Sequence, residues 1–203
     1  MKLFLTSHYL NNKHFNAFRN LLGKSKASKA LFITTASVPY GNEPKPQWLI
    51  ESLADMSILT KNYDETTLEE GDFMPENLEQ YDFIFATGGN LFYLAYRLAE
   101  TGMGKKIKKY IANEGIYSGS SAGAVILMKY IAYFSLADDL SKAPKVYPGL
   151  GIINKAIIPH ADSEKYSDVM KNIADKYKKE GNEVLIFNDN QVLIIDGDRE
   201  NIL

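Results

Sequence analysis

The stretch Gly119-Ser120-Ser121-Ala122-Gly123-Ala124 follows a short apolar run at residues 115–118 and leads into a helix-forming segment at residues 124–128. A strand that turns sharply through small residues into a helix is the nucleophile-elbow arrangement, and G-x-S-x-G is its sequence pattern. The glycines avoid clashes with neighbouring backbone, and Ser121 is expected at the exposed turn, near the positive end of the helix dipole. Small residues at such a turn are also common packing devices, so the rest of the chain must supply a base, an acid and oxyanion donors.

The composition is that of an ordinary soluble globular protein, and its 203 residues suit a single domain spanning residues 1–203. The formal net charge of −2 predicts no attraction to nucleic acid or to acidic membranes. The chain has no Cys and 3 His, which excludes disulfides and thiolate catalysis and favours neither a metal nor another cofactor. No segment reaches the roughly 18 apolar residues of a membrane span, and the N-terminal apolar run is too short for a signal peptide. We therefore expect a cytoplasmic protein.

Short apolar runs alternate with segments of helical spacing along the whole chain. Strands are predicted at residues 3–6, 29–35, 57–61, 81–87, 115–118 and 155–160, and helices at residues 14–22, 44–59, 91–100, 105–113 and 163–179. The last two strands, at residues 183–187 and 191–195, are expected to form a hairpin through Asn188-Asp189-Asn190. This alternation predicts an α/β fold with a doubly wound, mostly parallel sheet, an antiparallel edge and helices on both faces.

Ligands of such sheets bind at the carboxyl ends of the strands, and further candidate residues fall there. Thr87-Gly88-Gly89-Asn90 follows a buried strand, so its backbone N–H groups could serve as oxyanion donors, or it could simply be a tight turn with Asn90 as helix cap. His160 ends a strand at the same edge as Ser121 and is the candidate base, with His8 in reserve. His14, in a predicted helix with Asn and Lys neighbours, is expected to be solvated.

The acid that would orient His160 has two candidate positions. Asp189 lies in the turn between the last two strands, whereas Asp138 and Asp139 lie in the loop beyond the helix that follows Ser121. The first position gives the order Ser-His-Asp along the chain and the second gives Ser-Asp-His. The residues alone leave both open.

Taken together, Gly119-Ser120-Ser121-Ala122-Gly123-Ala124, the upstream Thr87-Gly88-Gly89-Asn90 and the downstream Pro159-His160 resemble the aspartyl dipeptidase (dipeptidase E) family of serine peptidases, a group that includes cyanophycinase. The resemblance covers most of the chain and implies a class I glutamine amidotransferase-like fold, a flavodoxin-like three-layer sandwich. It implies Ser121 as nucleophile, His160 as general base and Asp189 as the third member, where the family usually has Glu. It also implies an oxyanion hole formed by the N–H groups of Gly89 and Ala122.

The same resemblance indicates how a substrate would be held. Asn90, Asp138 and Asp139 are the candidate substrate contacts, since an acidic residue in the loop after the elbow helix would recognise a substrate amine or support the site. The family also has an Arg after the catalytic His that holds an aspartate side chain, but residues 161–168 contain no Arg, and Lys165 is only a point charge. Specificity for an N-terminal Asp is therefore not predicted.

The function predicted from the sequence is that of a serine-type peptidase that hydrolyses small peptides. The alternatives are a catalytically silent binding domain with the same scaffold, or an esterase or amidase that acts on a non-peptide acyl substrate. A homodimer is possible for a small member of such a family, and nothing in the sequence fixes its interface.

Overall fold

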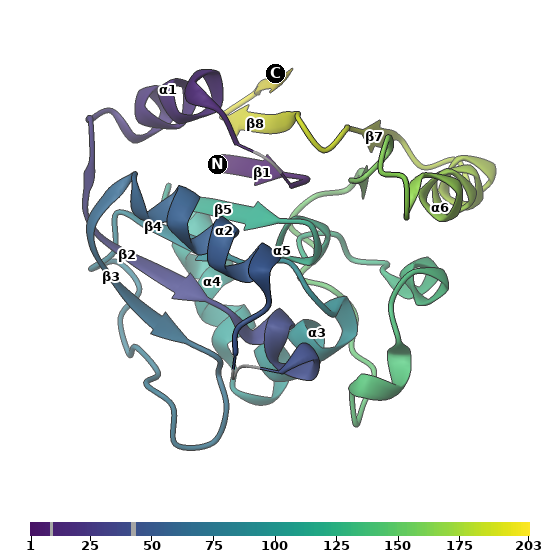
Figure 1. The fold of residues 1–203 in the computed structure, drawn as a ribbon, viewed down its shortest axis with the longest axis horizontal. Coiled ribbons are helices and arrows are strands. Elements are labelled where there is room, and N and C mark those ends of the chain that lie inside the picture. The colour runs from purple at the N-terminus through teal and green to yellow at the C-terminus, as the bar shows by residue number, and fades with distance from the viewer. Residues whose placement is uncertain (9, 42–43) are drawn as a thin grey trace.

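A seven-stranded, mostly parallel sheet forms the centre of the computed structural model, which describes residues 1–8, 10–41 and 44–203 (Figure 1). Its strand order is β3-β2-β4-β5-β1-β8-β9, parallel from β3 to β1 and antiparallel at β8 and β9. A separate two-stranded parallel sheet pairs β6 with β7. The strands are β1 (Lys2–Thr6), β2 (Ala27–Ile33), β3 (Thr60–Thr66), β4 (Phe83–Ala86), β5 (Ile116–Ser120), β6 (Ala156–Ile158), β7 (Val184–Ile186), β8 (Val192–Asp196) and β9 (Arg199–Ile202).

Helices cover both faces of the large sheet. The helices of the chain are α1 (Asn12–Leu22), α2 (Gln47–Ser57), α3 (Leu91–Glu100), α4 (Met103–Ala112), α5 (Ala122–Val125) and α6 (Ser167–Lys179), with short 3₁₀ helices η1 (Thr35–Tyr40), η2 (Ala132–Leu136) and η3 (Leu140–Lys142). Helix α6 packs against the small sheet rather than the large one (Figure 1). Successive strand residues point to opposite faces, so Phe4 packs in one core with α1 and α2, whereas Leu3 and Leu5 pack in the other with α3, α4 and α5. The predicted three-layer α/β fold is confirmed.

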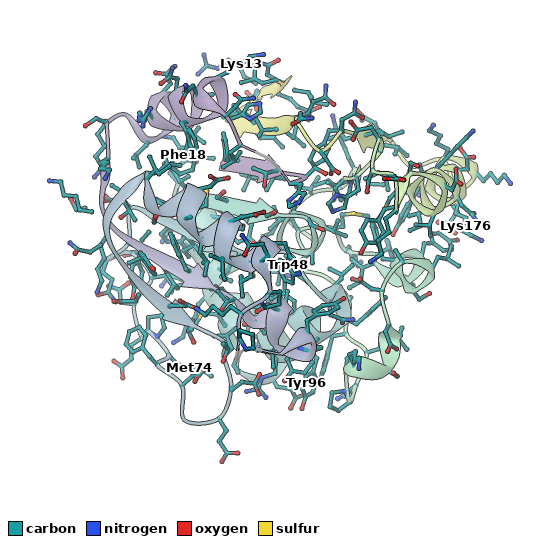
Figure 2. All side chains as sticks on the ribbon, in the orientation of Figure 1. Lys13, Phe18, Trp48, Met74, Tyr96 and Lys176 are labelled. Carbon is teal, nitrogen blue, oxygen red and sulfur yellow. The ribbon has the colours of Figure 1, made fainter. Side chains whose placement is uncertain are left out.

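Helix α1 illustrates how one face of a helix is buried and corrects one expectation. Phe18 is fully buried against the sheet and meets Phe4 edge to face at a ring distance of 5.0 Å, while Lys13 points to solvent (Figure 2). His14, expected to be solvated, is instead buried, because it lies four positions before Phe18 on the same helical face. Burial, and to a smaller extent the charge of Lys13, lowers the pKa of His14.

The predicted hairpin of the last two strands is wrong. Strand β7 pairs with β6, whereas β8 lies between β1 and β9 in the large sheet. The physical reason is burial: Val192 and Leu193 of β8 are fully buried beside β1, which a hairpin at the edge of the small sheet would not achieve. Strand β9 was not predicted, because the sequence Arg-Glu-Asn-Ile has the charged character of a protected edge strand.

Two boundaries also differ from the prediction. Strand β3 occupies residues 60–66 rather than 57–61, because α2 continues to Ser57. The helix predicted at residues 124–128 is a single turn that ends at Val125. Within the described parts of the chain, no helix combines the length and apolar character needed to cross a bilayer.

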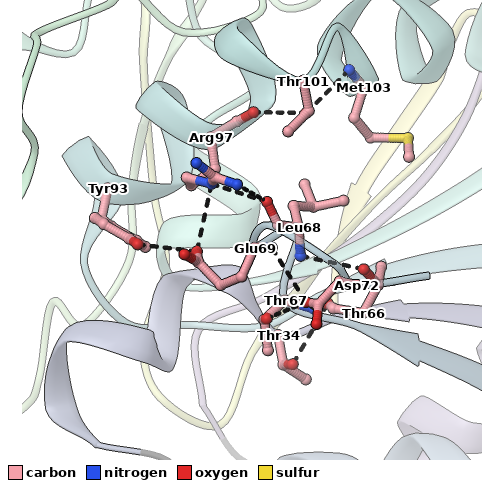
Figure 3. Close-up of polar contacts among 10 residues, drawn as sticks. All are labelled: Thr34, Thr66, Thr67, Leu68, Glu69, Asp72, Tyr93, Arg97, Thr101 and Met103. Atoms are coloured by element: carbon pink, nitrogen blue, oxygen red, sulfur yellow. Dashed lines mark hydrogen bonds and ion pairs between the residues drawn. The ribbon is translucent and has the colours of Figure 1, made fainter. Parts of the chain in front are cut away.

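A polar cluster anchors the loop after β3 to α3 (Figure 3). Arg97 of α3 donates from Nε to the carbonyl oxygen of Leu68 at 2.8 Å and forms an ion pair with Glu69 at 3.3 Å. The Tyr93 hydroxyl donates to Glu69, and the carboxylate of Asp72 accepts the Glu69 N–H. Leu68, fully buried, adopts a φ of 59° that is uncommon for a non-glycine residue. The cluster therefore fixes this loop against the helix that begins beside the Gly88-Gly89 turn.

Candidate active site

Ser121 occupies the sharp turn between β5 and α5. Its φ of 48° and ψ of −111° lie outside the regions that most L-residues adopt. A Cβ atom on Gly119 would lie 2.2 Å from the carbonyl oxygen of Gly123, and one on Gly123 would lie 2.1 Å from the carbonyl oxygen of Ala86. Both glycines are therefore required for the close approach of the turn to its neighbours, and the Ser121 N–H is held by the Thr6 carbonyl at 2.9 Å.

The Ser121 hydroxyl begins a continuous line of hydrogen bonds. Its Oγ lies 2.8 Å from Nε2 of His160, and Nδ1 of the same ring lies 2.5 Å from Oδ1 of Asp189. Burial raises the pKa of the Asp189 carboxyl, but hydrogen bonds from His160 and Ser7 outweigh this and lower it below its ordinary value. An ionised Asp189 can only accept, so we assign the proton to Nδ1, which leaves Nε2 to accept the Ser121 proton.

This line joins distant parts of the chain at one edge of the sheet. His160 follows β6 and Asp189 follows β7. These two strands form the small sheet and do not belong to the large one. Figure 1 shows the arrowheads of β1 and β5 pointing toward the region that carries β7 and α6. The structure thus places the predicted nucleophile, base and third member in contact, and it pairs the His160 imidazole with Asp189.

The Gly88-Gly89 turn lies against Ser121 on the side of β4. A Cβ atom on Gly88 would lie 3.2 Å from Cβ of Ser121, and one on Gly89, whose φ is 131°, would lie 2.1 Å from the carbonyl oxygen of Ala36. Ala122 is the first residue of α5, so its N–H has no acceptor within the helix. The structure therefore places the turn that contains Gly89 against Ser121, and Ala122 follows Ser121 directly in the chain.

A cavity of about 700 Å³ opens over Ser121 and His160. This volume is in the range of small-molecule binding sites. Aromatic and apolar side chains form much of its wall: Tyr40, Trp48, Leu91, Val125, Phe134, Tyr166 and Met170. Charged side chains also line it: Asp138, Asp162, Glu164, Lys165 and Asp189.

Asp138 is a half-buried acid of this cavity. Its Oδ2 accepts the N–H of Leu91 at 2.8 Å. Burial raises the pKa of its carboxyl to about 6, although the Leu91 N–H and the nearby His160 act in the opposite direction. The hydroxyl of Tyr40, another lining residue, has its pKa raised to about 12 by burial first and then by the charge of Asp138. Asp138 thus faces the cavity without pairing with the imidazole.

Asn90 and Asp139 hold the backbone around Asp138. The Asn90 side chain is fully buried, caps α3 by accepting the Tyr93 N–H at 2.9 Å, and donates to the carbonyl oxygen of Asp139 at 2.9 Å. The Asp139 carboxylate accepts the backbone N–H and the hydroxyl of Ser141. Among the described residues, those that line the cavity include Asp138 but neither Asn90 nor Asp139. Both side chains therefore support the loop rather than face the cavity.

Other residues named from the sequence take peripheral places. His8 lines the cavity with its ring 6.5 Å from that of His160, and Nε2 of His160 contacts Ser121. Lys165 lies over the Tyr166 ring at 4.7 Å, and Asp162 accepts the Asp189 N–H at 2.8 Å. In the described part of the chain, no group of three or more His, Cys, Asp or Glu residues is arranged to hold a metal ion.

Sequence reasoning missed Ser7, whose hydroxyl donates to Oδ1 of Asp189 at 2.7 Å. The available signal was its position directly after the first strand, at the same edge of the sheet as Ser121 and His160. A single serine at a strand end is too common a feature to be selected without the fold.

The family of the chain follows from comparison with known proteins. The profile of Peptidase family S51 matches residues 3–203. The chain belongs to peptidase family S51. An uncharacterized peptidase of Listeria monocytogenes is 32% identical over 179 residues, covering 86% of this chain and 85% of the relative. A second uncharacterized peptidase, from Pasteurella multocida, is 26% identical over 185 residues, covering 87% and 84%.

Solved structures agree with this assignment. A crystal structure of a Listeria monocytogenes protein provisionally assigned as peptidase E superposes with a TM-score of 0.79 at 26% identity and covers 100% of this chain and 97% of that one. A peptidase from an acI-B1 Actinobacterium shares the fold, with a TM-score of 0.69 at 18% identity and coverage of 100% and 86%. The resemblance to the dipeptidase E group is confirmed at the level of the family, and the S51 chain is a peptidase.

Proposed function

We propose that this S51 peptidase is a serine enzyme that hydrolyses small peptides through a covalent acyl-enzyme. The observation that carries the proposal is the line Ser121 Oγ–His160 Nε2–His160 Nδ1–Asp189 Oδ1, with separations of 2.8 and 2.5 Å, at the base of the cavity. A nucleophile in hydrogen-bond contact with a base, which an acid orients in turn, is the arrangement that nucleophilic catalysis requires.

In the proposed reaction, Nε2 of His160 takes the Ser121 proton while Oγ attacks the substrate carbonyl. The imidazolium then protonates the leaving amine, the C–N bond breaks, and an ester to Ser121 remains. Water, deprotonated by the same imidazole, attacks this ester and releases the carboxylic acid and the free Ser121. Asp189 holds the ring in the Nδ1-protonated tautomer and stabilises the imidazolium.

The N–H groups of Gly89 and Ala122 are the proposed oxyanion donors. Ala122 directly follows Ser121, and Gly88, the residue before Gly89, lies against it. The conformation of Gly89 is one that a residue with a side chain could not adopt without striking Ala36. Preorganised backbone donors of this kind stabilise the tetrahedral intermediate more than the planar substrate.

Asp138 is the proposed recognition group for the substrate amino terminus. It is the acid of the cavity wall with a raised pKa, and an incoming ammonium group would favour its ionised form. Asn90 and Asp139 contribute by holding the loop that carries it. A free amino terminus and a length of a few residues are therefore the substrate features that we propose, and residues 161–168 provide no guanidinium for an acidic side chain.

The proposal is tested by exposing the wild type, Ser121→Ala and Ser118→Ala to a fluorophosphonate and measuring the intact mass. A single adduct is expected on the wild type and on Ser118→Ala, and none on Ser121→Ala. Peptides of two to four residues, each with a free or an acetylated amino terminus, should then be hydrolysed only when the terminus is free. Hydrolysis that survives Ser121→Ala would refute the serine mechanism, and preference for an ester over every peptide would favour an esterase.

A further inference from the structure

The Ser7 side chain joins the base and the acid of the proposed site. Ser7 directly follows β1 and is buried, with 1% of its surface exposed. Its Oγ accepts the backbone N–H of His160 at 2.7 Å, donates to Oδ1 of Asp189 at 2.7 Å and lies 3.2 Å from Nδ1 of His160. One hydroxyl therefore contacts both the backbone and the ring of the base as well as its carboxylate partner.

The chemistry of the three groups fixes the direction of each hydrogen bond. The His160 N–H can only donate, so it uses one lone pair of the Ser7 hydroxyl. The Asp189 carboxylate can only accept, so the hydroxyl proton of Ser7 points to it. The second lone pair of Ser7 then faces Nδ1, and the Nδ1–H is shared between Asp189 and Ser7. All the hydrogen bonds among Ser7, His160 and Asp189 are satisfied only when the imidazole carries a proton on Nδ1.

The same contacts hold an unusual backbone conformation. His160 has a φ of 59°, in the left-handed region that non-glycine residues seldom adopt. Such conformations persist only where surrounding contacts fix them, and the bond from the His160 N–H to Ser7 is one of these contacts. The neighbouring carbonyl of Thr6 accepts the Ser121 N–H at 2.9 Å, so the end of β1 holds the nucleophile as well.

We propose that Ser7 is a positioning residue of this peptidase, which orients the His160 ring and the Asp189 carboxylate and fixes the Nδ1-protonated tautomer. Ser7 acts through these two residues and makes no bond to the substrate. The proposal rests on the proposed serine mechanism for its effect on rate, but its effect on the imidazole is independent of that mechanism.

The first measurement compares Ser7→Ala with Ser118→Ala by the kinetics of fluorophosphonate labelling. Ser118 is a matched control, because it is a fully buried serine of β5 whose hydroxyl has no partner among the described residues. Loss of hydrogen bonds to charged groups predicts that Ser7→Ala lowers the maximal labelling rate by about tenfold to a hundredfold, with the half-saturating probe concentration changed less than about threefold. Ser118→Ala should label like the wild type.

The second measurement does not depend on activity. The Nδ1–H proton of His160 should give a low-field ¹H resonance in the wild type, assigned by its loss in His160→Gln. We expect this resonance to move upfield and to exchange faster with solvent in Ser7→Ala, and to stay unchanged in Ser118→Ala. Thermal unfolding of each variant shows whether it is folded, and Ser7→Cys, which keeps the volume but is a weak donor, replaces Ser7→Ala if the latter does not fold.

The outcomes separate the two proposals. A Ser7→Ala variant with an unchanged resonance, or with a labelling rate within about threefold of the wild type, overturns the role of Ser7. If the wild type itself is not labelled and cleaves no peptide, the proposed serine mechanism fails, while the resonance still decides whether Ser7 positions the imidazole.

Discussion

The substitution Asp138→Asn tests whether the half-buried Asp138 of the cavity is maintained for binding at the expense of stability. In the folded chain, burial raises the pKa of this carboxyl from 3.8 to about 6, against the opposing effects of the Leu91 N–H and His160. A group whose pKa is raised on folding holds its proton more tightly in the folded state. Its ionisation therefore destabilises the fold, with no effect below about pH 4 and the full effect well above pH 6.

The magnitude follows from the two pKa values. Each pH unit between them corresponds to about 1.4 kcal/mol, so ionised Asp138 destabilises the protein by at most about 3 kcal/mol at pH 8 and by about 1.5 kcal/mol at pH 5. Asn at this position keeps an oxygen acceptor for the Leu91 N–H but cannot ionise. We therefore expect the variant to be more stable than the wild type by these amounts, with no gain at pH 3.5.

Urea unfolding at pH 3.5, 5 and 8 measures this difference. Asp139→Asn is the matched control: its carboxylate is exposed, and hydrogen bonds from Ser141 lower its pKa, so this substitution should slightly destabilise the protein at neutral pH. The Asp138 variant should also lose at least about tenfold in kcat/KM on peptides with a free amino terminus, as expected for a lost charge-assisted contact. A stability gain that is equal at pH 5 and pH 8, or no gain at all, would refute the reasoning.

Three further substitutions test the catalytic line, the turn and the anchored loop. Asp189→Asn, whose amide would donate to the imidazole and favour the wrong tautomer, should lower kcat/KM by roughly a hundredfold or more in a variant that still unfolds cooperatively, with a lower midpoint because the ionised carboxylate stabilises the fold; a loss below about threefold would contradict the assignment. Gly123→Ala places a Cβ atom 2.1 Å from the Ala86 carbonyl oxygen and should destabilise the fold by about 1–3 kcal/mol or more in thermal unfolding, whereas a neutral effect would show that the turn can relax. Arg97→Ala removes the bonds to the Leu68 carbonyl and should destabilise the protein by about 1.5–3 kcal/mol in urea with kcat retained, and an unchanged midpoint would show that the loop is held by other contacts.

The sheet, its helices and the meeting of Ser121 and His160 at the carboxyl ends of its strands could be predicted from the sequence, because they depend on local patterns. Residues 30–33 are continuously apolar since this part of β2 is buried on both faces, and the glycines around Ser121 report a close approach of backbone that tolerates no side chain. His160 could be placed because a residue after a strand lies at the edge where parallel strands end.

Strand pairing could not be predicted in the same way, because partners are chosen by burial across the whole molecule. Two apolar runs separated by Asn188-Asp189-Asn190 have the local pattern of a hairpin, yet β7 and β8 join different sheets. Residues 187–191 connect β7 in the small sheet to β8 in the large one. Asp189 lies in this connection and contacts His160. The choice between Asp189 and Asp138 likewise depended on which carboxylate the fold directs at the imidazole.

The order in which the chain is synthesised gives the position of Ser7 a further consequence. Ser7 is synthesised before its partner Asp189, which follows 182 residues later. β8, the neighbour of β1 on the side away from β5, emerges later still. Until that segment has joined the sheet, the His160 imidazole lacks its hydrogen bond to Asp189, so a growing chain carries Ser121, the proposed nucleophile, without the complete line of hydrogen bonds. In the proposed mechanism, peptide hydrolysis would then require that β1 and β8 have paired, so incompletely folded copies of the chain would not cleave peptides.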